Sequence, residues 1–219
     1  MYSDLFSASS VQDLMAVLPS LPYAIWETFY VTVLSTLLSL VLGLPLGVLL
    51  VAGEKNGVLP LPRWLLQVLN VIINLLRSVP FLILMIMVFP LSRLIIGTAV
   101  GTTATIVPLV VAAFPFVARL VETSLRELDE GVVEAAQSMG ATPFQIITKV
   151  MIPECLPGLI SSMTTALTTI LGYSAMSGVI GGGGLGKIAL SYGYYRYQTN
   201  IMIVCVVLLV LMVQVFQTV

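Results

Sequence analysis

The 219-residue sequence contains no histidine and only two cysteines, and 9% of its residues are charged. Without histidine, zinc sites and acid–base chemistry that depend on an imidazole are excluded. Cys155 stands beside a proline turn and Cys205 lies in an apolar run, so both suit packing better than a disulfide framework or a metal site. The formal net charge of −1 gives no support for nucleic-acid binding.

Apolar residues dominate the chain, at 58% of the sequence with a mean hydropathy of +1.09. A soluble globular domain carries about 25% charged residues, far more than this chain. Uncharged runs of about 20 residues predict helices that span a bilayer. We expect an all-α integral membrane protein, one transmembrane domain over residues 1–219. Its five spans are expected at about residues 24–51, 63–89, 103–118, 156–180 and 199–219.

Two glycines in the first expected span, Gly43 and Gly47, lie four positions apart. Small residues at this spacing let transmembrane helices approach closely. We interpret the pair as a helix-packing surface rather than a functional site.

The second apolar region is interrupted by Arg77-Ser78-Val79-Pro80. An arginine within an apolar region is costly, and it is a functional-site hypothesis by default. Alternatively, Trp64–Leu76 lies partly at the membrane interface, Arg77 reaches water, and Pro80 only kinks the helix. The residues leave both alternatives open.

The one long polar stretch lies between the third and fourth spans. Asp129 can cap a first short helix, and Gly140 tolerates the left-handed conformation that ends one. Thr142 can cap a second helix, with Gln145 three residues later as in a capping box. We predict two short capped helices that protrude from the membrane and that an aqueous partner could grip.

The same stretch resembles the EAA signature of ABC importer permeases. In that family, EAA is followed at fixed spacing by a glycine and then by Ile-x-Leu-Pro; Val150 and Ile152 replace the Ile and the Leu, and Pro153 is retained. The resemblance implies a coupling loop over about residues 119–155 that docks into an ATPase. The residues that it assigns to this coupling are Glu134, Ala135, Ala136, Gly140, Ala141, Thr142, Pro143, Ile152 and Pro153.

The likeness extends over nearly the whole chain. Gly172–Gly178, the following glycine run through Gly186, and Tyr192-Gly193-Tyr194 are similar to segments of the methionine-importer permeases, and so are Arg77–Phe81 and Met139–Pro143. This implies a type I importer permease fold with methionine as the substrate, its D-enantiomer or related derivatives included. A permease for another amino acid is the alternative.

The resemblance also implies partners and a location. Permeases of this family form homodimers whose two loops dock into two cytoplasmic ABC ATPase subunits, while a periplasmic or lipid-anchored binding protein delivers the amino acid. The chain would then be a multi-pass protein of the bacterial inner membrane and no enzyme. It would bind no cofactor itself, because ATP and Mg belong to the ATPase.

The positions of Lys and Arg predict the orientation. Arg93, Lys187 and Arg196 fall on the N-terminal side of the membrane, and five basic residues fall on the other: Lys55, Arg63, Arg119, Arg126 and Lys149. The positive-inside rule therefore places the coupling loop in the cytoplasm and the N-terminus outside. The N-terminal segment lacks the basic residues of a secretory signal. Since the last apolar run continues to Val219, we expect a short further tail.

Gly181–Ile188 matches most of the phosphate-binding pattern G-x-x-x-x-G-K. It fails at Ile188, which has no hydroxyl for magnesium, and a membrane span precedes it instead of a strand. The same run fits G-x-G-x-x-G without its structural context. A flexible or re-entrant turn is the better interpretation, because glycine permits unusual backbone conformations.

The fourth span is rich in serine and threonine. Such hydroxyls bond across to other helices or line a wet path, and packing is favoured for any single one. As a cluster they are candidates for the lining of a transport pathway: Met163, Thr164, Thr168, Tyr173, Ser174 and Met176.

An ion-coupled secondary transporter is the rival hypothesis. It would need ionisable groups near the middle of the membrane, and apart from Arg77 the expected spans offer almost none. It would also leave the capped loop helices unexplained. A membrane enzyme is disfavoured, since no paired carboxylates or nucleophile with a base occur in the spans.

Overall fold

The computed structural model describes residues 8–218, which contain helices and no β-strand. The chain divides into two compact units. Three of the four boundaries between them fall within long helices, and the fourth lies between two helices, at Pro80 and Phe81. The first unit contains the chain up to Ser35, Phe81–Leu109 and the residues from Leu167 onward. The second unit contains Thr36–Pro80 and Val110–Ala166.

Among the residues that the structure describes, four helical segments are long and apolar enough to cross a membrane, and there are five if α3 (Arg63–Ser78) and α4 (Phe81–Ile96) count as one broken span. The four are Gln12–Ala52, Thr103–Arg126, Leu156–Ile180 and Thr199–Thr218. The predicted apolar regions are thus confirmed as helices. The second region differs in detail: Val79 is extended, as the residue before a proline prefers, so the helix breaks there instead of only kinking.

The third membrane segment is longer than predicted. After a short 3₁₀ turn at Thr103–Thr105, helix α5 runs over Ile106–Arg126, well past the expected limit at residue 118. The charged residues beyond residue 118 pair with one another on α5 and with residues of neighbouring segments. Because these charged side chains are paired, the helix continues past them.

In the second unit, helix α2 (Leu21–Ala52) packs closely against α5. A Cβ added to Gly43 would lie 2.8 Å from Val117 Cγ1, and one added to Gly47 would lie 2.6 Å from the carbonyl oxygen of Ala118. The prediction that these two glycines form a packing surface is confirmed.

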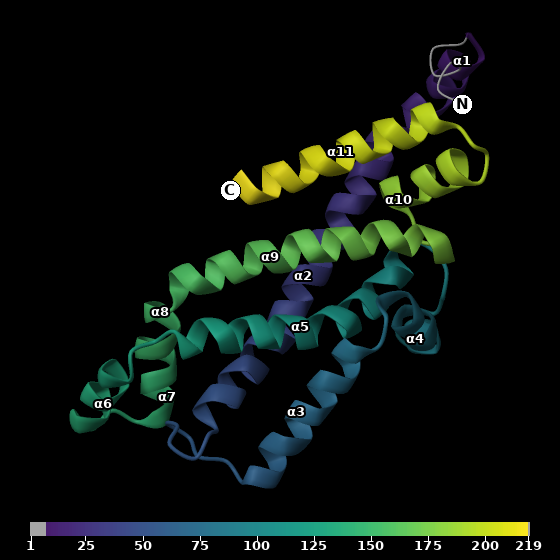
Figure 1. Cartoon of the computed structure of the whole chain (residues 1–219). Helices are drawn as coiled ribbons and strands as arrows, with labels where there is room; N and C mark the ends of the chain where they lie inside the picture. Colours follow the sequence, from purple (N-terminus) through teal and green to yellow (C-terminus); the bar gives the residue numbers. More distant parts are fainter. Residues whose placement is uncertain (1–7, 219) are drawn as a thin grey trace. The chain divides into compact units, whose positions relative to one another are not determined.

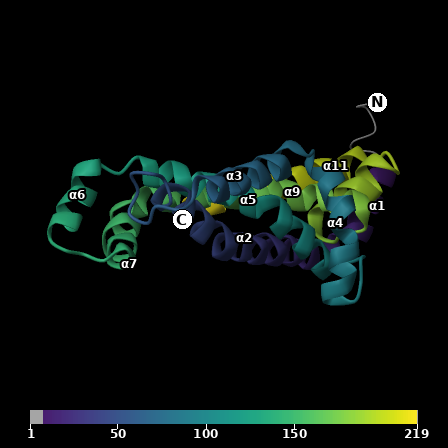
Figure 2. The ribbon, with the colours of Figure 1, turned by 90° about the horizontal axis from the view of Figure 1, so that it is seen from below.

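The polar loop of the second unit is helical. Helix α6 (Glu130–Ser138) and helix α7 (Pro143–Ile146) lie next to each other (Figures 1 and 2). A π-helical turn, Ile147–Met151, and the short α8 (Ile152–Glu154) lead into α9 (Leu156–Met176). Pro153 cannot donate a backbone hydrogen bond, and the wider π turn accommodates its insertion into a continuing helix.

The first unit contains α1 (Ala8–Val17), a 3₁₀ turn at Leu18–Ser20, the start of α2, and α4. After α9 come a 3₁₀ turn (Ser177–Ile180), α10 (Gly184–Ile188), a π-helical turn (Ala189–Tyr194) and α11 (Thr199–Thr218). In Figure 1, α10 lies beside α11. One apolar core joins α1, the start of α2, α10 and α11: Val17, Leu21, Ala24, Leu185, Ile188, Ile201 and Cys205.

Candidate functional site

The predicted caps of the loop helices are present. Asp129 Oδ1 accepts the Gly131 N–H at 2.7 Å at the start of α6. Thr142 and Gln145 form the capping box: the Thr142 N–H donates to Gln145 Oε1 at 2.9 Å and the Gln145 N–H to Thr142 Oγ1 at 3.4 Å. Between the two helices Gly140 has a φ of +77°, in the left-handed region. The helix pair with a glycine hinge is therefore confirmed.

The predicted coupling residues divide into a buried and an exposed set. Ala136 is buried and shares a core with Ile146 and Met151, so its small side chain serves packing within the loop. Ala141 and Ile152 are half-buried. The exposed members, which are available to a partner, are Glu134, Ala135, Gly140, Thr142, Pro143 and Pro153.

Two apolar side chains at the hinge are absent from the predicted set. Met139 is 81% exposed and Phe144 is 74% exposed, one on each side of Gly140–Pro143. Large apolar side chains presented together outside the spans indicate an interaction surface. They are difficult to find from the sequence. The only sign is that they are apolar but do not lie on the faces of α6 and α7 that pack into the core.

A charge network holds α5 to its neighbours in the second unit. Glu122, which is 8% exposed, pairs with Arg119 at 2.5 Å and with Arg126 at 3.0 Å. Arg126 also pairs with Glu54, at the end of α2, at 2.5 Å. Arg119 donates to Asn70 Oδ1 and Asn74 Oδ1 on α3 at 2.6 and 3.0 Å. Reasoning from the sequence missed this network because it ended the third span before Arg119.

A groove of about 340 Å³ lies at the base of the loop and is lined partly by the carboxylates of Glu127, Asp129 and Glu154. Cys155 lines the same groove. Burial raises the pKa of the Cys155 thiol, and the negative charges of Glu127 and Glu154 raise it further. Within residues 8–218, no group of three or more His, Cys, Asp or Glu side chains is arranged to hold a metal ion.

Arg77 lies in the last turn of α3, with its side chain exposed. A cation at this position suits the negative end of the helix dipole. The helix ends one residue later, at the break before Pro80. Whether Arg77 acts in transport stays a prediction.

The six candidate pathway residues are spread along α9. Met163 and Thr164 belong to the second unit, and Thr168, Tyr173, Ser174 and Met176 belong to the first. Tyr173 stacks on Phe81 of α4, with ring centroids 4.2 Å apart. Ser174 is buried, and its hydroxyl lies 3.4 Å from that of Thr32 on α2. Met176 is exposed. Their role as a lining stays a prediction.

The glycine run of the first unit has a role that the sequence does not reveal. Glu27 Oε2 on α2 accepts the Gly184 N–H at 2.8 Å, and Glu27 Oε1 accepts the Thr102 hydroxyl at 2.5 Å. The neighbouring hydroxyl of Thr28 accepts the Leu185 N–H at 2.9 Å. A helix and a 3₁₀ turn precede the run, so the nucleotide-binding alternative lacks its structural context.

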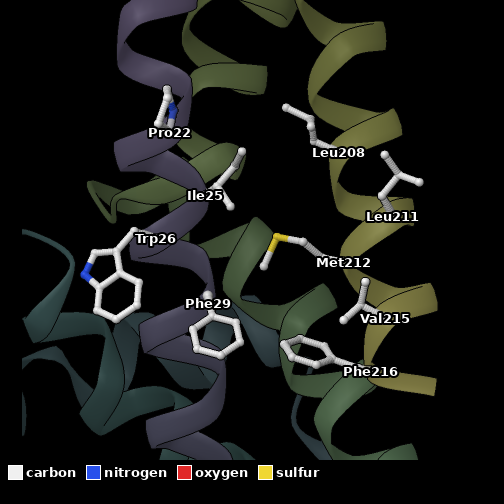
Figure 3. A pocket seen from close by; sticks show the side chains of 9 residues that line it. All are labelled: Pro22, Ile25, Trp26, Phe29, Leu208, Leu211, Met212, Val215 and Phe216. Atoms are coloured by element: carbon white, nitrogen blue, oxygen red, sulfur yellow. The ribbon is translucent and has the colours of Figure 1, made fainter. Parts of the chain in front are cut away.

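Two hollows in the first unit are poor candidates for an amino-acid site. A buried cavity beside Glu27, lined by hydroxyls that include those of Thr105 and Ser177, has a volume of only about 10 Å³. That is room for about one water molecule. A groove between α2 and α11 has a volume of about 520 Å³, and its lining is almost wholly apolar (Figure 3). Its only polar side-chain group is the indole N–H of Trp26, too little to bind a zwitterion.

Residues 39–219 match the protein family described as binding-protein-dependent transport system inner membrane component. The chain is 51% identical over 199 residues to the probable D-methionine transport system permease protein MetI of Vibrio cholerae serotype O1. This alignment covers 90% of this chain and 87% of that protein. It is 45% identical over 154 residues to the D-methionine transport system permease protein MetI of Escherichia coli K12, which covers 70% of each.

The comparison with solved structures gives the same family. A chain of the MetNI methionine ABC transporter, determined in inward-facing conformations, matches with a TM-score of 0.88 and 43% identity over 94% of both chains. An amino acid ABC transporter crystallised with histidines matches with a TM-score of 0.72 and 20% identity over 96% of this chain and 93% of that one, which shows a shared fold alone. The all-α importer permease fold and the resemblance to importer permeases are thereby confirmed. The chain belongs to the family of binding-protein-dependent transport system inner membrane components.

Proposed function

We propose that this chain is the transmembrane subunit of an ATP-driven ABC importer that takes up methionine, D-methionine and related derivatives included. The observation that carries the proposal is the capped helix pair α6–α7, which presents Met139 and Phe144 outside the membrane-spanning helices. The names of the relatives and the methionine ABC transporter with a TM-score of 0.88 support the substrate.

The loop is built to transmit force to a membrane helix. Ala136 of α6 and Ile146 of α7 share one apolar core with Val121 and Leu125 of α5. Because a packed core deforms little, a displacement of the loop helices would move the cytoplasmic end of α5 with them. An ATPase that grips the loop through Glu134 and the hinge at Gly140 could thus drive alternating access.

The partners follow from the same proposal. Two cytoplasmic ATPase subunits would bind the loops of two copies of this chain, and they alone would bind ATP and Mg. This chain would bind no cofactor and catalyse no reaction. A periplasmic or lipid-anchored binding protein would deliver methionine from the side opposite the loop. The distribution of Lys and Arg supports a cytoplasmic loop and an external N-terminus.

The experiment is co-purification of this chain with its candidate ATPase, followed by measurement of ATP hydrolysis with and without L-methionine and the binding protein. We expect a stable complex whose hydrolysis rate responds to methionine or to the loaded binding protein. A response to a different amino acid would favour the alternative substrate. Failure to bind any ATPase, together with uptake by this chain alone, would overturn the proposal in favour of ion-coupled transport.

Variants in the loop test the coupling residues. Glu134→Lys and Gly140→Asp should uncouple ATP hydrolysis from uptake while the spans stay folded. Glu130→Lys is the matched control, because it makes the same change of charge one turn earlier on α6. Full transport by both loop variants would show that the assigned coupling role is wrong.

A further inference from the structure

In the glycine run Gly181–Gly184, the backbone N–H of Gly184 binds a carboxylate that belongs to the chain itself, that of Glu27. Both oxygens of the Glu27 carboxylate are engaged, one by the Thr102 hydroxyl and one by the Gly184 N–H. Within residues 8–218, no Lys or Arg forms an ion pair with Glu27. The Thr102 hydroxyl and the Gly184 N–H are therefore the two groups that hold the Glu27 carboxyl group in place.

The glycines are required because the carboxylate and two hydroxyls lie so close to the backbone. A Cβ at Gly183 would lie 2.1 Å from Thr102 Oγ1 and 2.7 Å from Glu27 Oε2. A Cβ at Gly184, whose φ is +77°, would lie 2.4 Å from Thr28 Oγ1. Any larger residue would push the backbone away from α2. Close contacts with Glu27, Thr28 and Thr102 thus account for two glycines of the run, Gly183 and Gly184.

Further hydrogen bonds join the glycine run to the end of α9. The Gly182 N–H donates to the carbonyl oxygen of Ser177, directly after α9, at 3.0 Å, and the Ser177 hydroxyl donates to the carbonyl oxygen of Ser174 at 2.6 Å. Ser174 in turn meets Thr32 of α2. Four of the six candidate pathway residues lie in this C-terminal half of α9. Contacts that fix the position of the glycine run therefore also fix the position of these residues.

We propose that Glu27 is a positioning residue for transport: its carboxylate, bound by the glycine run, holds the end of α9 and the pathway residues there in place. This inference rests on the proposed function for its transport part. The binding of the carboxylate by the glycine run can be tested without it.

The experiment uses the full chain assembled with its ATPase partner in lipid nanodiscs or proteoliposomes, and compares Glu27→Ala, Glu27→Asp and the wild type. Glu27→Ala should lower the melting temperature, expose the Gly184 and Leu185 amides to hydrogen exchange, and reduce methionine uptake per assembled complex about tenfold. ATP hydrolysis should persist. Added formate should restore part of the melting temperature and uptake of Glu27→Ala, and Glu27→Asp should retain part of both.

Thr102→Val provides a second test, with Thr103→Val as its matched control on the exposed neighbouring threonine. The first should weaken uptake and the second should not. If formate leaves the stability and exchange of Glu27→Ala unchanged, or if the Gly184 amide of this variant exchanges as slowly as in the wild type, the carboxylate does not bind there. If formate rescues stability but Glu27→Ala transports normally, the positioning role is wrong. A wild type without uptake would overturn the proposed function and leave the formate result standing.

Discussion

The loop helices α6–α7 and the glycine run at the start of α10 both depend on side chains that accept hydrogen bonds from backbone N–H groups. The two regions differ in how far apart in the sequence the donor and the acceptor lie. In the loop, each cap comes from a residue two or three positions away, as in Asp129 with Gly131 and Thr142 with Gln145. At the glycine run, the cap comes from Glu27, 157 residues earlier in the chain. Short-range caps make the loop self-contained, whereas the long-range cap fixes the tertiary arrangement of the first unit.

The two regions also use glycine differently. Gly140 and Gly184 have the same φ of +77°, yet a Cβ at Gly140 would meet nothing within 4 Å and one at Gly184 would meet Thr28 Oγ1 at 2.4 Å. At Gly140 only the backbone conformation requires glycine. At Gly184 the close contact with α2 requires it as well.

The largest expected effect on stability distinguishes Gly184 from Gly140. Gly184→Ala should lower the free energy of unfolding by about 3 kcal/mol or more, because steric overlap adds to the left-handed strain. Gly140→Ala should lower it by about 1 kcal/mol, since strain acts alone. Denaturant titration of the two variants in parallel measures the difference. Equal losses would show that the crowding at Gly184 has no energetic effect.

A smaller difference in stability is expected between variants of the two capping threonines, Thr28 and Thr142. Thr28→Val leaves the buried Leu185 N–H without its acceptor and should lower the free energy of unfolding by about 2 kcal/mol. Thr142→Val removes one half of an exposed capping box, where water can replace the hydroxyl, and should lower it by about 1 kcal/mol. The same titration compares them. A greater loss for Thr142→Val would contradict the ranking.

The smallest effect concerns Cys155, at the base of the loop. Since its pKa is raised, less thiolate forms at neutral pH, and alkylation in a Cys205→Ala background should be slower than for an ordinary thiol and should accelerate with pH. Glu127→Gln removes one negative charge and should speed the reaction. Glu130→Gln, outside the groove, is the control. Equal rates for both variants would contradict the influence of Glu127.

The range of an interaction decided how well it could be predicted from the sequence. The apolar helices, the packing glycines Gly43 and Gly47 and both loop caps are recognised from residues close together in the chain. These features are confirmed, although the second span is broken and the third is longer than predicted. Glu27 lies alone near the start of the first expected span, and its partners could not be predicted because they lie in two distant segments. The Glu122 network was missed because the third span was expected to end before Arg119, and because Glu54 and Asn70 lie far from it in the chain.

The most direct test of the importer function is methionine uptake into proteoliposomes that contain this chain with its ATPase partner. We predict uptake that requires ATP on the loop side, requires loaded binding protein on the opposite side, and is abolished by Glu134→Lys while hydrolysis continues. Uptake without ATP and without the ATPase, driven instead by an ion gradient, would contradict the proposed function.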